Sequence, residues 1–401
     1  MTLAIDLLLT VLSIAVFVPA AVLFTEVMAA RKRPIPSGLA EADDSASPRT
    51  VVLMPAHDEA NGIGETIDSL RPQLGAADRL LVVADNCSDA TARIARAHGA
   101  QVIERSDPSR RGKGYALDFG CRWLERDPPE VVVVLDADCT LAPGSLHALA
   151  SVCRESGRPA QALYLMHAPP GAPLGLRIAA FAWIVKNQVR PLGADALGWP
   201  CQLMGTGMAF PWPLLRVALL ATSHLVEDMQ LGLDLATRGA APLFCARASL
   251  SSTFPLGRES VVSQRTRWEH GHLSLIAGAA PRLLVRAIAA GNGRLLAMVL
   301  DLIVPPLAAL VTSTAVLIVL DAIAWRFAAA SALPLAVASA AMALVACAVI
   351  SAWARYGRGA VSWRELLAIP LYVAAKLPVY ARLFTRRQVE WIRTKRDGQG
   401  R

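Results

Sequence analysis

Charged side chains are scarce in this sequence, and the signature motifs of several common enzyme classes are missing. Asp, Glu, Lys and Arg make up 18% of the 401 residues, whereas hydrophobic residues make up 54%. This balance departs from ordinary soluble proteins and favours segments that lie in a bilayer. The seven cysteines are scattered without a C-x-x-C pair, which is typical of a reducing compartment and argues against a thiolate metal site. No G-x-x-x-x-G-K-S/T loop and no H-E-x-x-H motif occurs, so neither a Walker-type phosphate loop nor a zincin-type histidine site is expected.

Three long uncharged runs account for the hydrophobic excess: residues 7–24, 302–320 and 327–353. As helices that rise about 1.5 Å per residue, these runs are long enough, or nearly so, to cross the hydrocarbon core of a membrane. We therefore expect an N-terminal transmembrane anchor at 1–30 and a transmembrane hairpin at 299–355. Buried core helices are the alternative, but soluble helices rarely extend about 18 residues without a charge.

Basic residues predict how these segments are oriented. The start MTLAID carries no positive charge, whereas the cluster Arg31, Lys32 and Arg33 follows the first run, which favours a retained anchor over a cleaved signal peptide. By the positive-inside rule, the residues after this anchor lie in the cytoplasm. Further basic residues follow the hairpin, and they predict that the C-terminus lies in the cytoplasm as well. The expected protein is therefore a multi-pass protein of the plasma (inner) membrane, with its middle domain in the cytoplasm.

Two segments beside the predicted spans are expected to lie at the membrane surface. Residues 273–298 are amphipathic, which predicts interfacial helices. Residues 356–401 are expected to form an interfacial or re-entrant segment and a basic cytoplasmic tail, because prolines and basic residues interrupt the apolar stretch 366–384. The net charge of +8 gathers largely beside the membrane segments, where anionic lipid headgroups are a simpler partner than nucleic acid. A lipid bilayer is therefore an expected partner, and nucleic acid is not.

The middle of the chain has the pattern of an α/β domain. After a polar linker at 31–49, strand-like runs alternate with helical patterns, and the runs are residues 51–54, 79–84, 100–104 and 131–135. Such alternation predicts a Rossmann-like, mostly parallel sheet with helices on both faces. Ligands of this architecture bind at the carboxyl edge of the strands, so the residues after each run form the candidate site.

Polar side chains follow these runs. Asp136 and Asp138 come directly after the Val-rich fourth run and can both offer oxygen to one Mg²⁺ or Mn²⁺ that bridges to substrate phosphates. A helix N-cap with a solvated turn is the alternative for this pair. Taken alone, Lys113 in the segment RGKG indicates a solvated basic turn. Beside the acidic strand ends, the same residue is placed to bind a pyrophosphate.

Three later motifs carry further candidate groups. Glu227 and Asp228 begin a predicted helix, where they either suit the helix dipole or present a base to an acceptor hydroxyl. The motif QRTRW at 264–268 combines an arginine that can balance a departing diphosphate with an indole that offers a sugar an apolar face. An interfacial arginine and tryptophan are the alternative for this motif. The motif GTG at 205–207 lacks the third glycine of a dinucleotide fingerprint and indicates a loop that passes close to substrate.

In chain order, the segments PAHDE, VADNCSDAT, RGKGYAL, DADC, GTG, VED and QRTRW resemble the motifs of the processive-type family 2 glycosyltransferases. This family includes cellulose, hyaluronan and poly-N-acetylglucosamine synthases, and the ceramide glucosyltransferases are similar in this set. The resemblance covers residues 50–272 and implies a GT-A fold for them. It also implies an inverting, metal-dependent hexosyltransferase with Mg²⁺ or Mn²⁺ as cofactor and a nucleotide-sugar, expected to be a UDP-sugar, as donor.

The resemblance implies roles for single residues. The donor-binding set is Pro55, His57, Glu59, Asp85, Lys113, Asp136 and Asp138, and the metal is assigned to Asp136 and Asp138. The catalytic set is Asp228 as general base, with Glu227 and Arg267. The acceptor-binding set is Gly205, Thr206, Gln264 and Trp268.

Two departures from the family pattern bear on the acceptor and on processive action. The familiar Thr-Glu-Asp triplet has Val226 in place of its threonine, which removes a hydroxyl near the acceptor end. Polymer-extruding synthases generally have more spans than the three predicted here, so a self-made channel requires chains to associate as a homo-oligomer.

The sequence is compatible with more than one kind of acceptor. The expected function is transfer of a sugar to a glycan or lipid-linked acceptor in envelope or exopolysaccharide synthesis. A glycolipid synthase of the ceramide glucosyltransferase type is one alternative, because it uses the same chemistry. A non-catalytic membrane scaffold or export component is an alternative of another class.

Overall fold

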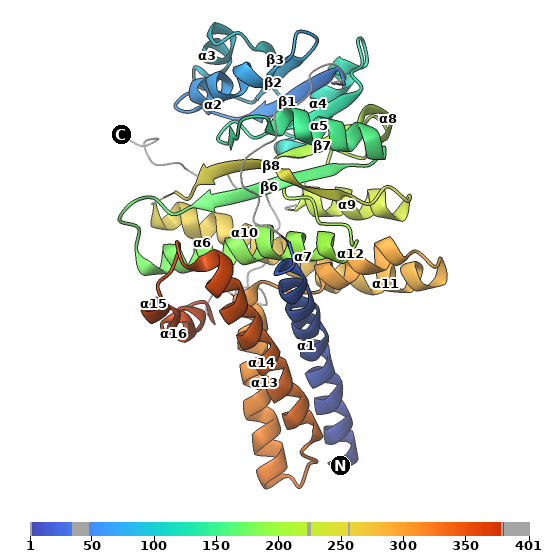
Figure 1. Ribbon diagram of the computed structural model, residues 1–401, viewed down its shortest axis with the longest axis vertical. Helices are drawn as coiled ribbons and strands as arrows, with labels where there is room; N and C mark the ends of the chain where they lie inside the picture. The colour runs from blue at the N-terminus through green and yellow to red at the C-terminus, as the bar shows by residue number, and fades with distance from the viewer. Residues whose placement is uncertain (1, 34–47, 223–225, 256, 378–379, 381–401) are drawn as a thin grey trace. The chain divides into compact units, whose positions relative to one another are not determined.

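Figure 1 shows the computed structural model, which describes residues 2–33, 48–222, 226–255, 257–377 and 380, with the backbone alone at 258–265. Two compact units are present, and neither follows chain order. Within the described residues, the sheet unit draws on 35–167 and 200–261, and the helical unit draws on 1–34, 168–199 and 262–388. The stretch 50–272 is therefore shared between the units, because 168–199 and 262–272 pack with the helices.

The sheet unit is built on a mixed sheet. Its described strands are β1 (Thr50–Ala56), β2 (Arg79–Asp85), β3 (Gln101–Arg105), β4 (Val131–Val134), β5 (Thr140–Leu141), β6 (Ala160–His167), β7 (Met208–Pro211) and β8 (Leu243–Thr253). They lie side by side in the order β3-β2-β1-β4-β7-β6-β8-β5. β3, β2, β1 and β4 run parallel, as do β6 and β8, whereas β7 is antiparallel to β4 and β6, and β5 is antiparallel to β8.

The four strand-like runs of the sequence are confirmed as β1 to β4, and a parallel arrangement is confirmed for these four strands. The antiparallel pairings of β7 and β5 were not expected and make the sheet mixed. β8 was not predicted either, because its sequence LFCARASLSST contains an arginine and several serines instead of an unbroken apolar run.

The first strands are covered on both faces, which explains their continuous apolar sequences. Val52 and Leu53 of β1 point to opposite faces and are both 0% exposed. Helix α4 (Lys113–Leu124) packs against β1, β2 and β3. A Cβ at Gly120 would lie 2.5 Å from a methyl carbon of Leu53, so the missing side chain lets this helix approach the sheet closely.

The other described helices of the sheet unit connect or cover the strands. They are α2 (Ile63–Leu70), η2 (Arg71–Gln73), α3 (Thr91–Ala97), α5 (Ser145–Ser156), α8 (Trp212–Leu215) and α9 (Glu227–Thr237). Helix α9 begins at the expected acidic pair and ends just before Gly239, whose φ of +85° fits the left-handed turn that follows many helices. The predicted helix is therefore confirmed.

The helical unit draws its elements from both ends and from the middle of the chain. They are α1 (Thr2–Ala30), α6 (Leu174–Ile184), η3 (Val185–Val189), α7 (Arg190–Ala196), α10 (Arg258–Gly278, from residue 262 on), α11 (Ala280–Ala289), α12 (Gly293–Leu302), α13 (Leu307–Phe327), α14 (Leu333–Ala352), η4 (Trp353–Gly357), α15 (Trp363–Leu366) and α16 (Ile369–Ala374). Helix α1 contacts both α13 and α14, which also contact each other.

Three described segments are long and apolar enough to cross a membrane: Leu3–Ala30, Leu307–Phe327 and Leu333–Gly357. A fourth candidate arises if the bent pair Thr266–Gly278 and Ala280–Ala289 is counted as one segment. The predicted run at 302–320 begins before the helix does, because residues 302–304 are apolar but precede α13. That helix starts after Pro306, which cannot donate a backbone hydrogen bond, and it includes Arg326 in its last turn.

A buried ionic network joins three helices of this unit. Arg190 at the start of α7 donates through Nε to Glu26 of α1 at 2.7 Å, and through Nη2 to the backbone and side-chain oxygens of Asp301 in α12. Glu26 is 0% exposed, and a Cβ at Gly193 would lie 1.9 Å from its carbonyl oxygen. Helices α1 and α7 therefore meet backbone to backbone, with the guanidinium neutralising carboxylates beside the contact.

We expect Arg190→Met to lower the stability of the protein by about 3–5 kcal/mol, because it leaves two carboxylates buried without their cation. Thermal unfolding of the purified protein measures this loss. Arg33→Gln is the matched control: it removes the ion pair with Asp195, whose partners are 45% and 38% exposed, and such pairs contribute about 0–1 kcal/mol. Equal melting temperatures for the two variants would contradict a stabilising role of the buried network.

Candidate active site

A lysine neutralises the acidic end of β4. Lys113, the first residue of α4, forms an ion pair with Asp136 and donates to the carbonyl oxygen of Gly205 at 2.7 Å. Burial lowers the pKa of Lys113, but the Asp136 carboxylate, with smaller contributions from the first two residues of α9, raises the pKa above its ordinary value overall. The ammonium group therefore stays charged where α4, β4 and α9 meet.

A buried glutamine fixes the loop that carries Gly205 and Thr206. Gln161 of β6 is 0% exposed; its side-chain oxygen accepts from the Met204 backbone N–H at 2.8 Å, and its amide nitrogen donates to the Thr206 carbonyl at 2.9 Å. The Thr206 hydroxyl in turn accepts from the backbone N–H of Asp136 at 3.0 Å. A single glutamine inside a strand forms no recognisable pattern, so Gln161 could not be predicted from the sequence.

Asp228 lies against the same loop. Gly205 has a φ of +88°, and a Cβ placed there would lie 3.3 Å from Asp228 Oδ2. Because Gly205 also bonds Lys113, the structure brings Lys113, Asp136 and Asp228 together from three separate elements. Glu227 and Asp228 occupy the first turn of α9, where the helix dipole favours negative charge.

Asp85, at the end of β2, is buried in an ion pair. Arg105 Nη1 donates to Asp85 Oδ1 at 2.6 Å, and the Asn86 side-chain amide donates to the same oxygen at 3.0 Å. The two charged side chains are 8% and 10% exposed. The sequence predicted Asp85 as a donor-binding residue, and the structure adds Arg105 of β3 as its fixed partner, which no motif indicated.

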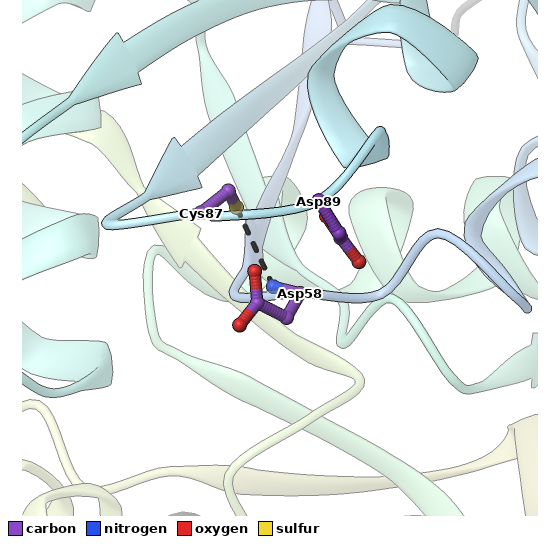
Figure 2. Close-up of side chains that lie close together, drawn as sticks. All are labelled: Asp58, Cys87 and Asp89. Carbon is purple, nitrogen blue, oxygen red and sulfur yellow. Dashed lines mark hydrogen bonds between the residues drawn. The ribbon is translucent and has the colours of Figure 1, made fainter. Parts of the chain in front are cut away.

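The loops after β1 and β2 meet at a cluster of three side chains, Asp58, Cys87 and Asp89 (Figure 2). Each offers one ligand atom, and the three atoms lie within 4.8 Å of one another. The chemistry does not suit a metal, because burial raises the pKa of Cys87 to about 11 and both carboxylates already bond the backbone of their own loop. Asp58 Oδ1 accepts the Ser88 backbone N–H at 2.6 Å, and Asp89 Oδ1 accepts the Thr91 backbone N–H at 2.9 Å. The backbone N–H of Asp58 donates to Cys87 Sγ at 3.4 Å, so the cluster holds the two loops together.

The donor-binding residues expected at 55–59 line this junction. Pro55 lies within β1 opposite Val83 of β2. His57 donates through Nδ1 to the backbone oxygen of Asp85 at 2.7 Å. The Glu59 backbone N–H donates to the Thr91 hydroxyl at 2.7 Å. These bonds fix the backbone next to the ends of β1 and β2.

A second group, Asp136, Asp138 and Cys139, also offers ligand atoms within 4.8 Å of one another. Burial, with the two neighbouring carboxylates, raises the pKa of the Cys139 thiol well above its ordinary value, so the sulfur stays protonated and is a poor ligand. The two carboxylates remain, and carboxylate oxygen is the donor that Mg²⁺ and Mn²⁺ prefer. The residues present therefore fit a hard divalent cation.

The remaining predicted residues lie on α10, in the helical unit. The Trp268 ring contacts that of Trp183 on α6, with centroids 4.9 Å apart and planes tilted by 41°. Arg267 precedes Trp268 on the same helix and is partly buried. The backbone of Gln264 is helical, and its side chain lies outside the described part of the chain.

Comparison with known proteins agrees with this architecture. The model of a family described as "Glycosyltransferase like family 2" matches residues 48–271. The match covers more than half of the chain, and the protein belongs to this family of glycosyltransferases.

Single relatives resemble parts of the chain. A glucosyl-3-phosphoglycerate synthase of Mycolicibacterium paratuberculosis is 37% identical over 107 residues, which cover 25% of this chain and 32% of that protein. A low-salt glycan biosynthesis hexosyltransferase of Haloferax volcanii is 36% identical over 104 residues, which cover 25% of this chain and 24% of that protein. The matched region thus spans a third or less of these curated relatives.

A solved mannosyltransferase from Pyrobaculum calidifontis, in complex with GDP-Man and Mn²⁺, is similar over 92% of this chain and 98% of its own. The TM-score is 0.52 and the sequence identity is 19%. This likeness establishes the GT-A type of fold.

Gly205→Ala is expected to reduce glycosyl transfer by roughly three- to ten-fold, because the new Cβ shifts the carboxylate of Asp228, the predicted general base, by a few tenths of an ångström, and small misplacements of reacting groups are costly. Steady-state transfer assays measure the loss. Gly239→Ala is the control, since its φ of +85° gives it the same backbone strain, about 1–2 kcal/mol, with nothing within 4 Å of the new Cβ. Equal losses of activity in the two variants would show that strain, and not the contact with Asp228, is responsible.

Proposed function

We propose that this family 2 glycosyltransferase is an inverting, metal-dependent enzyme. It moves a sugar from a nucleotide-sugar, expected to be a UDP-sugar, to a glycan or lipid-linked acceptor in envelope or exopolysaccharide synthesis. The observation that carries the proposal is the convergence of Lys113, Asp136 and Asp228 at one edge of the sheet. A fixed cation among carboxylates suits a diphosphate and a general base in one place.

Asp228 is assigned as the general base, with Glu227 beside it in the catalytic set. It takes the proton of the acceptor hydroxyl while that oxygen forms a bond to the anomeric carbon. The bond between this carbon and the diphosphate oxygen breaks on the opposite face, and the electron pair leaves with the nucleoside diphosphate. One in-line displacement inverts the configuration, so no covalent intermediate is needed.

The departing diphosphate gains negative charge, which cationic side chains can balance. Lys113 is assigned to this role because its ammonium is held beside Asp136 and Gly205. Arg267 is assigned to it by its motif. Asp136 and Asp138 would hold Mg²⁺ or Mn²⁺, which when bound supplies Lewis-acid stabilisation of the diphosphate. The similar mannosyltransferase, solved with GDP-Man and Mn²⁺, supports a divalent cation here.

The remaining residues are assigned to the donor and the acceptor. Pro55, His57, Glu59 and Asp85 lie at the ends of β1 and β2 and are assigned to the nucleoside. Gly205, Thr206, Gln264 and Trp268 are assigned to the acceptor by their motifs.

Membrane attachment forms part of the proposal. The three apolar segments support a multi-pass protein of the plasma (inner) membrane, and the basic cluster at 31–33 supports a cytoplasmic active site. An acceptor anchored in the bilayer would then meet the enzyme at the lipid surface. A homo-oligomer is proposed only for the case in which the product is a polymer that the chains extrude.

The purified protein, supplied with a panel of radiolabelled UDP- and GDP-sugars and bacterial lipid extract, tests the activity. We expect one donor to be consumed, with label moving to a product. Label in the organic phase would identify a lipid or lipid-linked acceptor, and label in the aqueous phase would identify a free glycan. Absence of transfer from every donor would favour the scaffold or export alternative.

Asp228→Asn is expected to lower the rate of transfer by about 10²–10⁴-fold, because an amide cannot accept the proton. Binding of the nucleoside diphosphate, measured by calorimetry, should stay unchanged. Asp234→Asn, on the same helix and bonded to Gln230, is the control and should keep its activity. Turnover retained in Asp228→Asn would contradict the assignment of the base.

Chelation of divalent cations by EDTA should abolish transfer, and added Mg²⁺ or Mn²⁺ should restore it, because Asp136 and Asp138 are negatively charged and the cation would screen them from the diphosphate. Asp138→Asn should raise the metal concentration needed for half-maximal activity by on the order of ten-fold. Asp89→Asn, in the cluster judged unsuited to a metal, should leave this concentration unchanged. Full activity in EDTA would rule out the cation.

A further inference from the structure

A C-terminal segment contacts α10 next to its QRTRW motif. We call residues 363–376, which include α15 and α16, the brace. Lys376 of the brace forms an ion pair with Glu269, the residue that follows Trp268. The two side chains are only 17% and 12% exposed, so this is a largely buried pair and not a surface contact.

The brace is also fastened to α6. Arg177 donates to both carboxylate oxygens of Glu365, at 2.6 and 2.7 Å, which is the strong bidentate geometry of an arginine and a carboxylate. A Cβ at Gly175 would lie 3.8 Å from the ring of Tyr372, so this ring packs on the first turn of α6. The Lys376 ammonium lies 5.5 Å from the centroid of the same ring, within the range of a cation–π interaction.

Helix α6 contacts α10 in turn through Trp183 and Trp268. The three parts of the helical unit therefore contact one another pairwise: α6 with the brace, the brace with α10, and α10 with α6. Trp268 is held from one side by Trp183, and its neighbour Glu269 is held by Lys376. Because successive residues of a helix point about 100° apart, the two contacts together fix the rotation of α10 about its axis.

We propose that Lys376, acting through Glu269, is a positioning residue for glycosyl transfer. The brace sets the rotation of α10 and with it the direction in which Arg267 and Trp268 are presented. The inference rests on the roles proposed for these two residues. We expect it to affect transfer more than nucleotide binding, because Arg267 is assigned to the charge that develops on the departing diphosphate, whereas the nucleoside is assigned to residues of the sheet unit.

The test uses the full-length protein in lipid nanodiscs. Lys376→Met removes the cation, and the double variant Glu269→Lys with Lys376→Glu restores an ion pair of reversed polarity. Arg364→Met is the matched control, because Arg364 lies in the same segment, is exposed and stacks only on the neighbouring Trp363 among the contacts described. Three quantities are measured: hydrogen exchange of residues 266–278, kcat/KM for the acceptor, and Kd for the nucleoside diphosphate.

In Lys376→Met we expect faster exchange of 266–278 and a loss of about ten-fold or more in kcat/KM for the acceptor, with a smaller change in Kd for the nucleotide. The charge-reversed variant should restore most of the protection of 266–278 from hydrogen exchange and most of the kcat/KM for the acceptor. Arg364→Met should stay within about two-fold of the wild type in all three.

Wild-type exchange and transfer in Lys376→Met would overturn the proposal, and so would a charge-reversed variant that performs no better than the single one. If Lys376→Met does not accumulate as folded protein, the charge-reversed variant decides alone. A wild-type protein that transfers no sugar would contradict the proposed function, while hydrogen exchange of α10 would still decide whether the brace holds this helix.

Discussion

A single ammonium group held among carboxylates is the interaction on which the candidate site depends. Asp136 follows β4, and Glu227 and Asp228 begin α9; these carboxylates would repel one another if they met without a counter-charge. Lys113 resolves this repulsion, and its bond to Gly205 ties the charge to the loop against which Asp228 lies. The same arrangement is suited to a diphosphate leaving group, because a cation and hard oxygen ligands already lie at the site.

The rest of the sheet unit holds this arrangement still. The Gln161 amide bonds the loop of Met204 and Thr206 through both its oxygen and its nitrogen. Arg105 forms an ion pair with Asp85 at the end of β2. Each of these polar groups is buried and bonded. Such groups add little net stability, but they penalise every alternative conformation that would leave them unpaired. The site is therefore rigid because its supports are polar and satisfied.

In the helical unit, buried or partly buried ion pairs likewise connect residues that are far apart in the sequence. Arg190 neutralises carboxylates from α1 and α12, and the pairs Arg177–Glu365 and Lys376–Glu269 attach the brace to α6 and α10. The segment after the last apolar helix thus returns to the helix that carries the QRTRW motif. Under the proposed function, such contacts keep the motif assigned to the acceptor in a fixed orientation.

Local patterns in the sequence determined β1 to β4, α9 and the three apolar helices, because hydrophobic periodicity and turn residues act over a few neighbouring positions. They also pointed to Lys113, Asp136 and Asp228, since parallel strands bring their carboxyl ends to one edge. The contacts of Gln161 and Arg105 and the antiparallel strand β7 were not predicted. The packing of residues 168–199 within the helical unit was not predicted either. Only the tertiary structure decided these features, because a buried polar group takes its partner from a distant part of the chain, and no local pattern records which partner that is.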